Sequence, residues 1–252
     1  MVLKRLQEYR QQGRKAFAVL IDPDKITRPN QLNQLMALSR KHRVDFFLVG
    51  GSLLTHDCLQ EVVTELKANS SVPVVLFPGS NMHINSQADA ILFLSLISGR
   101  NPDLLIGQHV VAAPILKKSG LEVLPTGYML VGGGTQTTVA YMSNTLPIPN
   151  TKPSIAACTA MAGELLGLKL IYMDAGSGAP EPVSPAVIRM VRKNVDCPLI
   201  IGGGLRSAAQ AERALEAGAD MLVVGNGIEK NLDLLAEVST VVQEYNATLN
   251  VH

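Results

Sequence analysis

The sequence predicts an α/β protein: a modified (β/α)8 barrel, the TIM barrel fold, forming a single domain over residues 1–252. Short apolar runs rich in β-branched residues alternate with helical patterns along the whole chain. The runs are apolar throughout, which is typical of parallel strands covered on both faces. Eight such runs in a chain of 252 residues favour a closed barrel over an open sheet.

The expected strands share this apolar character, and most of them end in Asp or Gly. In chain order they are residues 16–22, 46–50, 73–79, 88–96, 121–131, 168–174, 198–204 and 219–227. Pro125 lies inside the fifth strand, and we expect it to interrupt that strand because proline lacks a backbone N–H.

The segments between the strands carry apolar residues at helical spacing. After an N-terminal helix, the expected helices are residues 29–42, 55–68, 102–118, 152–167, 184–195, 207–218 and 232–248. Thr55 and Ser184 are the expected N-caps of two of them, and Pro185 follows Ser184 at a position that favours proline. Only residues 80–87 separate the third strand from the fourth, a stretch too short and polar for a normal crossover helix. The barrel is therefore expected to lack its third helix.

Composition excludes several classes of function. A net charge of +1 and the absence of Trp argue against a nucleic-acid partner, which would require a basic excess. No apolar stretch reaches the roughly 18 residues of a membrane span, and the basic start is not followed by the apolar region of a signal peptide. We expect a cytoplasmic protein, and peripheral contact with a membrane surface stays open.

Two glycine-rich loops predict a phosphate site. "GGGLRS" (202–207) follows the seventh strand and "GNGIEK" (225–230) follows the eighth. Backbone N–H groups at such loops, next to a helix N-terminus, bind phosphate, and these two loops are its usual place in this fold. The alternative is that the glycines only allow tight turns with positive φ.

Polar side chains at strand ends supply the candidate chemistry. Asp22 ends the first strand and is either a Mg2+ ligand or a turn cap, while Ser52 offers a further oxygen or caps a turn. Asp174 ends the sixth strand, where it can accept a proton from a substrate hydroxyl or bind the N–H groups of its own glycine loop. Tyr172 lies on the same face as Asp174, as a site residue or a core residue.

Five motifs in this order resemble the geranylgeranylglyceryl phosphate synthase family and its bacterial heptaprenyl relatives: "LIDPDK", "LVGGS", "YMDAGSG", "IIGGGLRS" and "VVGNGIEK". The stretch "FPGS…ADAILFLSLISGRNP" resembles the second group of that family. The resemblance covers essentially the whole chain. It implies a barrel without its third helix, assembled as dimers or hexamers.

The resemblance also implies the reaction and its residues. The family joins a polyprenyl diphosphate, here expected to be geranylgeranyl diphosphate, to the C3 hydroxyl of sn-glycerol 1-phosphate with Mg2+. Asp22 and Ser52 match its Mg2+ positions. Its glycerol-phosphate positions correspond to Tyr172, Met173, Asp174, Ala175, Gly176, Ser177, Gly178, Gly203, Gly204, Gly225 and Asn226. We expect Asp174 and Tyr172 to be catalytic, and an apolar groove near Phe93 and Leu94 to hold the chain.

Two positions depart from the family pattern. Many members carry Glu where this chain has Asp174, and many carry Lys where it has Leu20. Lys25 and Lys15 are the candidates to supply the missing cation. Two alternative functions stay open at this point. One is a sugar-phosphate isomerase or lyase with Asp22 and Asp174 as its acid and base, and the other is a non-catalytic barrel that binds a phosphometabolite.

Overall fold

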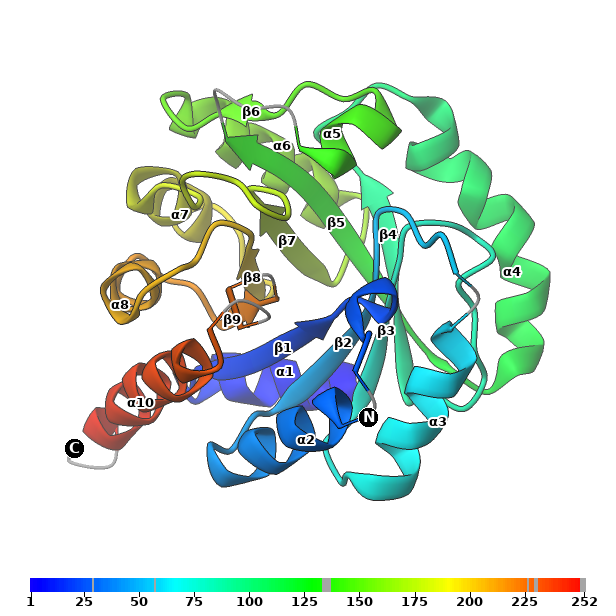
Figure 1. Cartoon of the computed structure of the whole chain (residues 1–252). Helices are drawn as coiled ribbons and strands as arrows, with labels where there is room; N and C mark the ends of the chain where they lie inside the picture. The colour runs from blue at the N-terminus through cyan, green and yellow to red at the C-terminus, as the bar shows by residue number, and fades with distance from the viewer. Residues whose placement is uncertain (29, 57, 133–136, 226, 229–230, 250–252) are drawn as a thin grey trace.

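A computed structural model of the chain describes residues 1–28, 30–56, 58–132, 137–225, 227–228 and 231–249. Eight parallel strands of this part close into a barrel, as predicted (Figure 1). In barrel order they are β1 (Ala16–Ile21), β2 (Phe46–Gly51), β3 (Val74–Pro78), β4 (Ala90–Leu96), β5 (Glu122–Gly132), β7 (Leu170–Asp174), β8 (Leu199–Gly202) and β9 (Met221–Val224). β9 pairs with β1 and closes the barrel, and the two-residue β6 (Ile148–Pro149) extends the end of β5.

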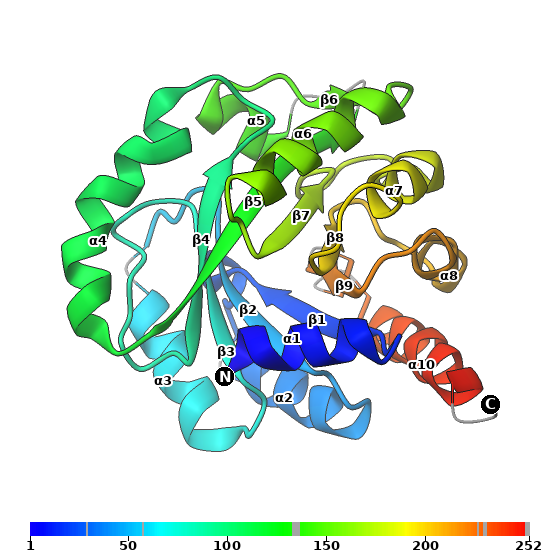
Figure 2. The ribbon, with the colours of Figure 1, turned by 180° about the vertical axis from the view of Figure 1, so that it is seen from behind.

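Helices surround the barrel on its outer side (Figures 1 and 2). The longer ones are α2 (Gln31–Lys41), α3 (Leu59–Asn69), α4 (Gln108–Ser119), α6 (Pro153–Leu165), α7 (Pro185–Arg192), α8 (Ala208–Glu216) and α10 (Asp233–Thr248). Short turns add η1 (Pro23–Lys25), the π-helical η2 (Asp103–Gly107) and α5 (Thr138–Ser143). Residues 79–89 are all described and contain no helix, so the prediction that the third crossover helix is missing is confirmed.

Two expectations about local structure were wrong. Pro125 does not interrupt β5, because its carbonyl still accepts a hydrogen bond from the Lys169 N–H (2.8 Å) and only its own donor is lost. Thr55 does not cap α3, because its N–H and hydroxyl both donate to Asp24 (2.6 and 2.8 Å) four residues before the helix begins. Ser184 does cap α7, accepting the Val187 N–H.

The core has two layers, one inside the barrel and one between strands and helices. Helix α1 (Val2–Gln11) crosses the N-terminal end of the barrel and buries Val2, Leu6 and Tyr9 in the inner layer (Figure 2). Glu122 fixes α1 by accepting the Val2 and Leu3 N–H groups. With that end covered, the C-terminal end of the barrel is the accessible one. Among the described residues no helix is long and apolar enough to span a membrane.

Candidate active site

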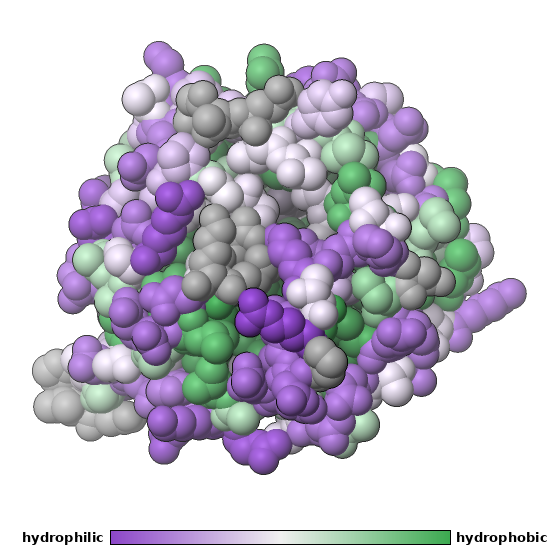
Figure 3. Space-filling model, viewed as in Figure 1, coloured by the Kyte–Doolittle hydropathy of each residue, from purple (hydrophilic) through white to green (hydrophobic). Residues whose placement is uncertain are grey.

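A cavity of about 490 Å³ opens at the C-terminal end of the barrel strands. Figure 3 views this end, where pale residues of intermediate hydropathy surround a hollow near the middle of the face. The lining includes seven of the predicted glycerol-phosphate residues: Tyr172, Asp174, Ser177, Gly178, Gly203, Gly204 and Gly225. Both predicted metal ligands, Asp22 and Ser52, line the same cavity. The strand order of the barrel thus brings together residues up to two hundred positions apart.

Of the predicted glycerol-phosphate residues that the structure describes, Met173, Ala175 and Gly176 do not line the cavity. The side chains of Met173 and Ala175 lie in the outer core, because neighbouring residues of a strand point to opposite sides. The Ala175 N–H donates to the Gly202 carbonyl (3.1 Å), and the Gly176 N–H donates to Asp174. Asn226 lies outside the described residues.

The loops after β7 and β8 pack closely against each other. Gly203 has a φ of +73°, and a Cβ atom there would collide with Asp174 Oδ1 and with the Gly176 nitrogen (2.6 Å). Glycine is therefore required at position 203 for both conformation and space. The loops after β7 and β8, which both carry predicted glycerol-phosphate residues, can meet because this position carries no side chain.

Arg206 is a residue of the cavity that the sequence analysis did not single out. Its guanidinium donates to the carbonyls of Gly178 (3.1 Å) and Ala179 (2.7 Å), tying the loop after β7 to the start of α8. Ser207 caps that helix by accepting the Gln210 N–H. A cation, glycine backbone and a helix N-terminus together suit an anion. The arginine within "GGGLRS" was the available signal.

Asp174 is buried at the base of the cavity without a cationic partner among the described residues. Its Oδ1 accepts the Gly176 N–H and its Oδ2 accepts the Tyr128 hydroxyl, each at 2.6 Å. Burial raises the pKa of Asp174, although both hydrogen bonds oppose the rise. Asp174 thus binds its own loop and also faces the cavity, so both of its predicted roles are compatible.

Tyr128 was missed by the sequence analysis. It lies on β5 directly opposite Tyr172 of β7, two positions before the level of Asp174. A phenol in an otherwise apolar inner layer must find a hydrogen-bond partner, and that requirement was the usable signal. Burial raises the pKa of Tyr128 and of Tyr172 well above the usual range, so both remain neutral.

Asp22 caps a turn, which was one of the two roles that the sequence left open, and it also lines the cavity. Its Oδ1 accepts the Asp24 N–H (3.2 Å) and caps η1, while its Oδ2 pairs with Lys25 (3.1 Å). Ser52 lies well before α3, so it does not cap that helix. Lys15 is bound to Asp220 at the opposite end of the barrel, which leaves Lys25 as the nearby cation.

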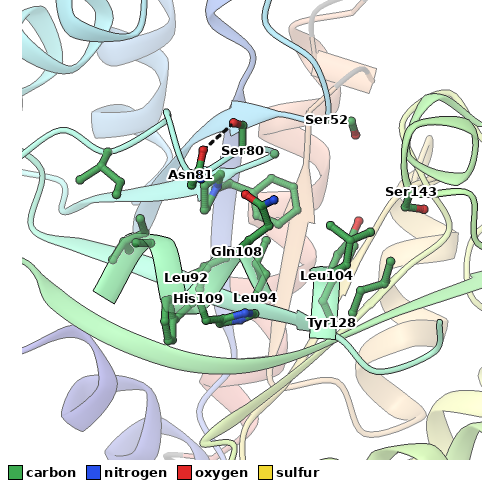
Figure 4. A pocket seen from close by; sticks show the side chains of 18 of the residues that line it. Ser52, Ser80, Asn81, Leu92, Leu94, Leu104, Gln108, His109, Tyr128 and Ser143 are labelled. Carbon is green, nitrogen blue, oxygen red and sulfur yellow. Dashed lines mark hydrogen bonds between the residues drawn. The ribbon is translucent and has the colours of Figure 1, made fainter. Parts of the chain in front are cut away.

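A second, smaller cavity of about 190 Å³ adjoins the first and has mostly apolar walls (Figure 4). Most of its lining comes from β3 and β4, the η2–α4 segment and α5, with further residues from the end of β2, residues 79–84 and Tyr128 of β5. Phe93 and Leu94, expected near the path of a chain, belong to it. The two cavities share Gly51, Ser52 and Phe77. The larger cavity, which is the more polar of the two, and the smaller, more apolar cavity therefore meet at the end of β2 and β3.

Residues 8–243 match the model of the PcrB family. The chain is 59% identical over 244 residues to a protein of Spirosoma linguale named geranylgeranylglyceryl phosphate synthase, covering 97% of this chain and 98% of that protein. A protein of the same name from Chitinophaga pinensis is 53% identical over 230 residues, or 91% of each chain. The crystal structure of (S)-3-O-geranylgeranylglyceryl phosphate synthase from Thermoplasma acidophilum with its substrate sn-glycerol-1-phosphate superposes with a TM-score of 0.90 at 31% identity, covering 97% of this chain and 99% of that one.

Proposed function

The chain belongs to the PcrB family, and from that premise we propose that it is a prenyltransferase acting on glycerol phosphate. It joins a polyprenyl diphosphate to the C3 hydroxyl of sn-glycerol 1-phosphate, forming an ether and releasing diphosphate. Geranylgeranyl diphosphate is the proposed donor, because the similar proteins carry that chain in their names.

The observation that carries the proposal is the pair of adjoining cavities. The polar one has a glycine-rich wall and Arg206, which suit a phosphate. The apolar one suits a hydrocarbon chain, with Leu92, Leu94 and Leu104 among its walls (Figure 4). A sugar-phosphate isomerase or lyase would have no use for the apolar cavity. A binding protein would have no use for a buried carboxylate without a cation.

Asp174 is the proposed general base. Ether formation requires removal of the proton of the attacking hydroxyl, and a carboxylate whose pKa is raised by burial holds that proton better than an exposed one. The Tyr128 hydroxyl donates a hydrogen bond to Oδ2 and the Gly176 N–H donates one to Oδ1, and together they fix the plane of the carboxylate. Tyr172, two residues before Asp174 on β7, also lines this cavity.

Mg2+ is the proposed cofactor, held by Asp22 and Ser52. Among the residues that the structure describes, no three His, Cys, Asp or Glu side chains form a cluster that could hold a metal. A single carboxylate and a hydroxyl on one cavity wall fit Mg2+, which commonly takes one or two carboxylates together with substrate phosphates. When bound, the ion would neutralise charge on the diphosphate leaving group. Lys25 lies beside Asp22 and adds positive charge there.

The test is transfer of radiolabelled glycerol 1-phosphate into organic solvent with allylic diphosphates of several chain lengths and Mg2+. Label should enter the organic phase with the 1-phosphate and not with its 3-phosphate enantiomer. An EDTA sample tests the cofactor separately. Absence of transfer with every chain length would refute the prenyltransferase and favour the sugar-phosphate alternative.

We also propose a cytoplasmic homo-oligomer that touches the membrane surface only peripherally. Helix α6 supports assembly, because Ile155 and Leu165 on it and Leu166 directly after it are large apolar side chains exposed on the surface. Helix α4 exposes Val110 and Val111 and carries Lys117 and Lys118 in its last turn. Exposed apolar residues beside lysines suit contact with a membrane surface. Light scattering and vesicle sedimentation would test the two contacts separately.

A further inference from the structure

The junction of the two cavities is lined by only three of the described residues that belong to both: Gly51, Ser52 and Phe77. Under the proposed function, on which this inference rests, the chain lies in the apolar cavity and glycerol phosphate in the polar one. The carbon that connects the chain to the departing and attacking oxygens must then lie at the junction. The side chains at the junction are therefore those that the reacting carbon meets.

The reaction places positive charge on that carbon. The bond between the allylic C1 and the diphosphate oxygen breaks, and its electron pair leaves with diphosphate. The C3 oxygen of glycerol phosphate forms the new bond to C1, and its proton passes to Asp174. While the first bond lengthens, positive charge spreads over C1 and C3 of the allylic unit. A group that stabilises this charge without forming a bond to it would lower the barrier.

Phe77 is the junction residue able to do this. Gly51 has no side chain, and the Ser52 hydroxyl is itself a nucleophile. The Phe77 ring is nearly buried, at 7% exposed, and borders both cavities. Tyr172 stacks on it with ring centroids 5.3 Å apart, and Tyr128 meets it at a steep angle at 5.8 Å. The two tyrosines therefore hold the ring in a fixed orientation.

We propose that Phe77 is a further catalytic residue, whose aromatic ring stabilises the developing allylic cation by a cation–π interaction. The ring's negative electrostatic face attracts a cation and is not consumed by it. The same three rings separate the charge from water, which would otherwise capture the cation. The neighbouring tyrosines stay neutral in this buried cluster, so the proton of the attacking hydroxyl goes to Asp174.

The test is site-specific replacement of Phe77 by mono-, di- and trifluorinated phenylalanine, which weakens the ring's electrostatic face with little change of shape. Single-turnover rates should fall stepwise, about tenfold across the series, while KM for glycerol 1-phosphate and the melting temperature stay constant. The matched control is the same series at Phe47, which is fully buried in the outer core and lines neither cavity. Rates in the control series should not change.

A second pair of variants guards against a purely structural effect. Phe77→Tyr keeps an aromatic face and should retain most of the rate, whereas Phe77→Leu should lose tenfold or more in kcat. A flat fluorinated series, or a rise in KM at constant kcat, would overturn the inference and leave Phe77 as a wall of the chain site. If the unaltered protein transfers no prenyl group, the proposed function itself fails, so the two failures are distinguishable.

Discussion

Carboxylates at the two ends of this barrel have opposite surroundings. Three carboxylates at the N-terminal end share one arrangement: Asp45, Asp89 and Asp220. Each directly precedes a strand and accepts a backbone N–H from the start of the neighbouring strand. Each also pairs with at least one cation, such as Lys67 for Asp89 at 2.7 Å. At the C-terminal end, Asp174 has two hydrogen-bond donors and no cation among the described residues.

This difference indicates which carboxylates contribute to stability and which one contributes to function. A buried charge with cations and backbone donors around it holds elements together, and removing it leaves the cations unpaired. A buried charge without a cation costs folding free energy and is retained for its chemistry. The fold places stability at the covered end and reactivity at the open end, as barrels of this class do.

The largest expected effect is on activity, from Asp174→Asn. The amide cannot take the proton of the hydroxyl, so kcat should fall by about 10²–10⁴-fold. The Tyr128 hydroxyl can turn to accept from the amide, so the fold should survive. Single-turnover kinetics with circular dichroism would measure both. A variant that keeps more than a tenth of the rate would contradict the role of Asp174 as base.

At the covered N-terminal end, Asp220→Asn should lower stability and leave activity unchanged. Asp220 pairs with Arg192 at 2.8 Å and with the buried Lys15 at 3.5 Å. Loss of its charge leaves these cations without their partner, so the free energy of unfolding should drop by about 3–5 kcal/mol. Urea unfolding would measure the drop. The folded fraction should retain its kcat, and a selective loss of kcat would break the proposed division between the two ends.

The same residues show how much of the fold and of the site could be predicted from the sequence. The strands were predictable because they are apolar runs with glycine or Asp at their ends, and so was the missing helix, from the short polar 80–87 segment. Tyr128 and Arg206 were not singled out, because their roles depend on which loops and strands become neighbours. Pairing across the barrel is a tertiary property, and no local pattern encodes the partner of a buried phenol.

Asp22 tests the comparison between the two ends, because it lies at the open end and pairs with a cation, Lys25. Lys25 in this pair is 39% exposed and Asp22 is 19% exposed, so loss of the pair in Asp22→Ala should change stability by less than about 1 kcal/mol. At limiting Mg2+ we expect kcat/KM for the diphosphate substrate to fall about 10- to 100-fold, with partial recovery at saturating Mg2+. A titration of activity against Mg2+ would measure this. Full activity of the variant at limiting Mg2+ would refute the metal assignment.

A smaller effect is expected from Tyr128→Phe, which removes one donor from Asp174. A hydrogen bond to a charged group contributes about 1.5–3 kcal/mol, and only the part of it that is stronger in the transition state affects the rate. The rate should therefore fall by about tenfold or less, through looser positioning of the carboxylate. The lost bond favoured the charged carboxylate, so the pKa of Asp174 should rise further. The acid limb of the rate profile should therefore move to higher pH. An unmoved limb would show that Tyr128 only fills space.

The smallest expected effect is the pH dependence of stability. Burial raises the pKa of Asp174 in the folded chain above its unfolded value of about 3.9, so its protonated form stabilises the fold. That contribution is complete below the unfolded pKa and is lost as pH rises through the folded pKa. Asp174→Asn has no such titration, so the variant should gain stability relative to the unaltered protein by about 1.4 kcal/mol for each unit by which the pKa is raised.

Thermal or urea unfolding from pH 4 to pH 8 would reveal this gain as a slope. The slope is the decisive quantity, because differences in packing between Asp and Asn add an offset that does not depend on pH. A difference between Asp174→Asn and the unaltered protein that does not change with pH would mean that the buried Asp174 carboxylate carries no cost for its charge, and its contrast with the paired carboxylates of the covered end would no longer stand.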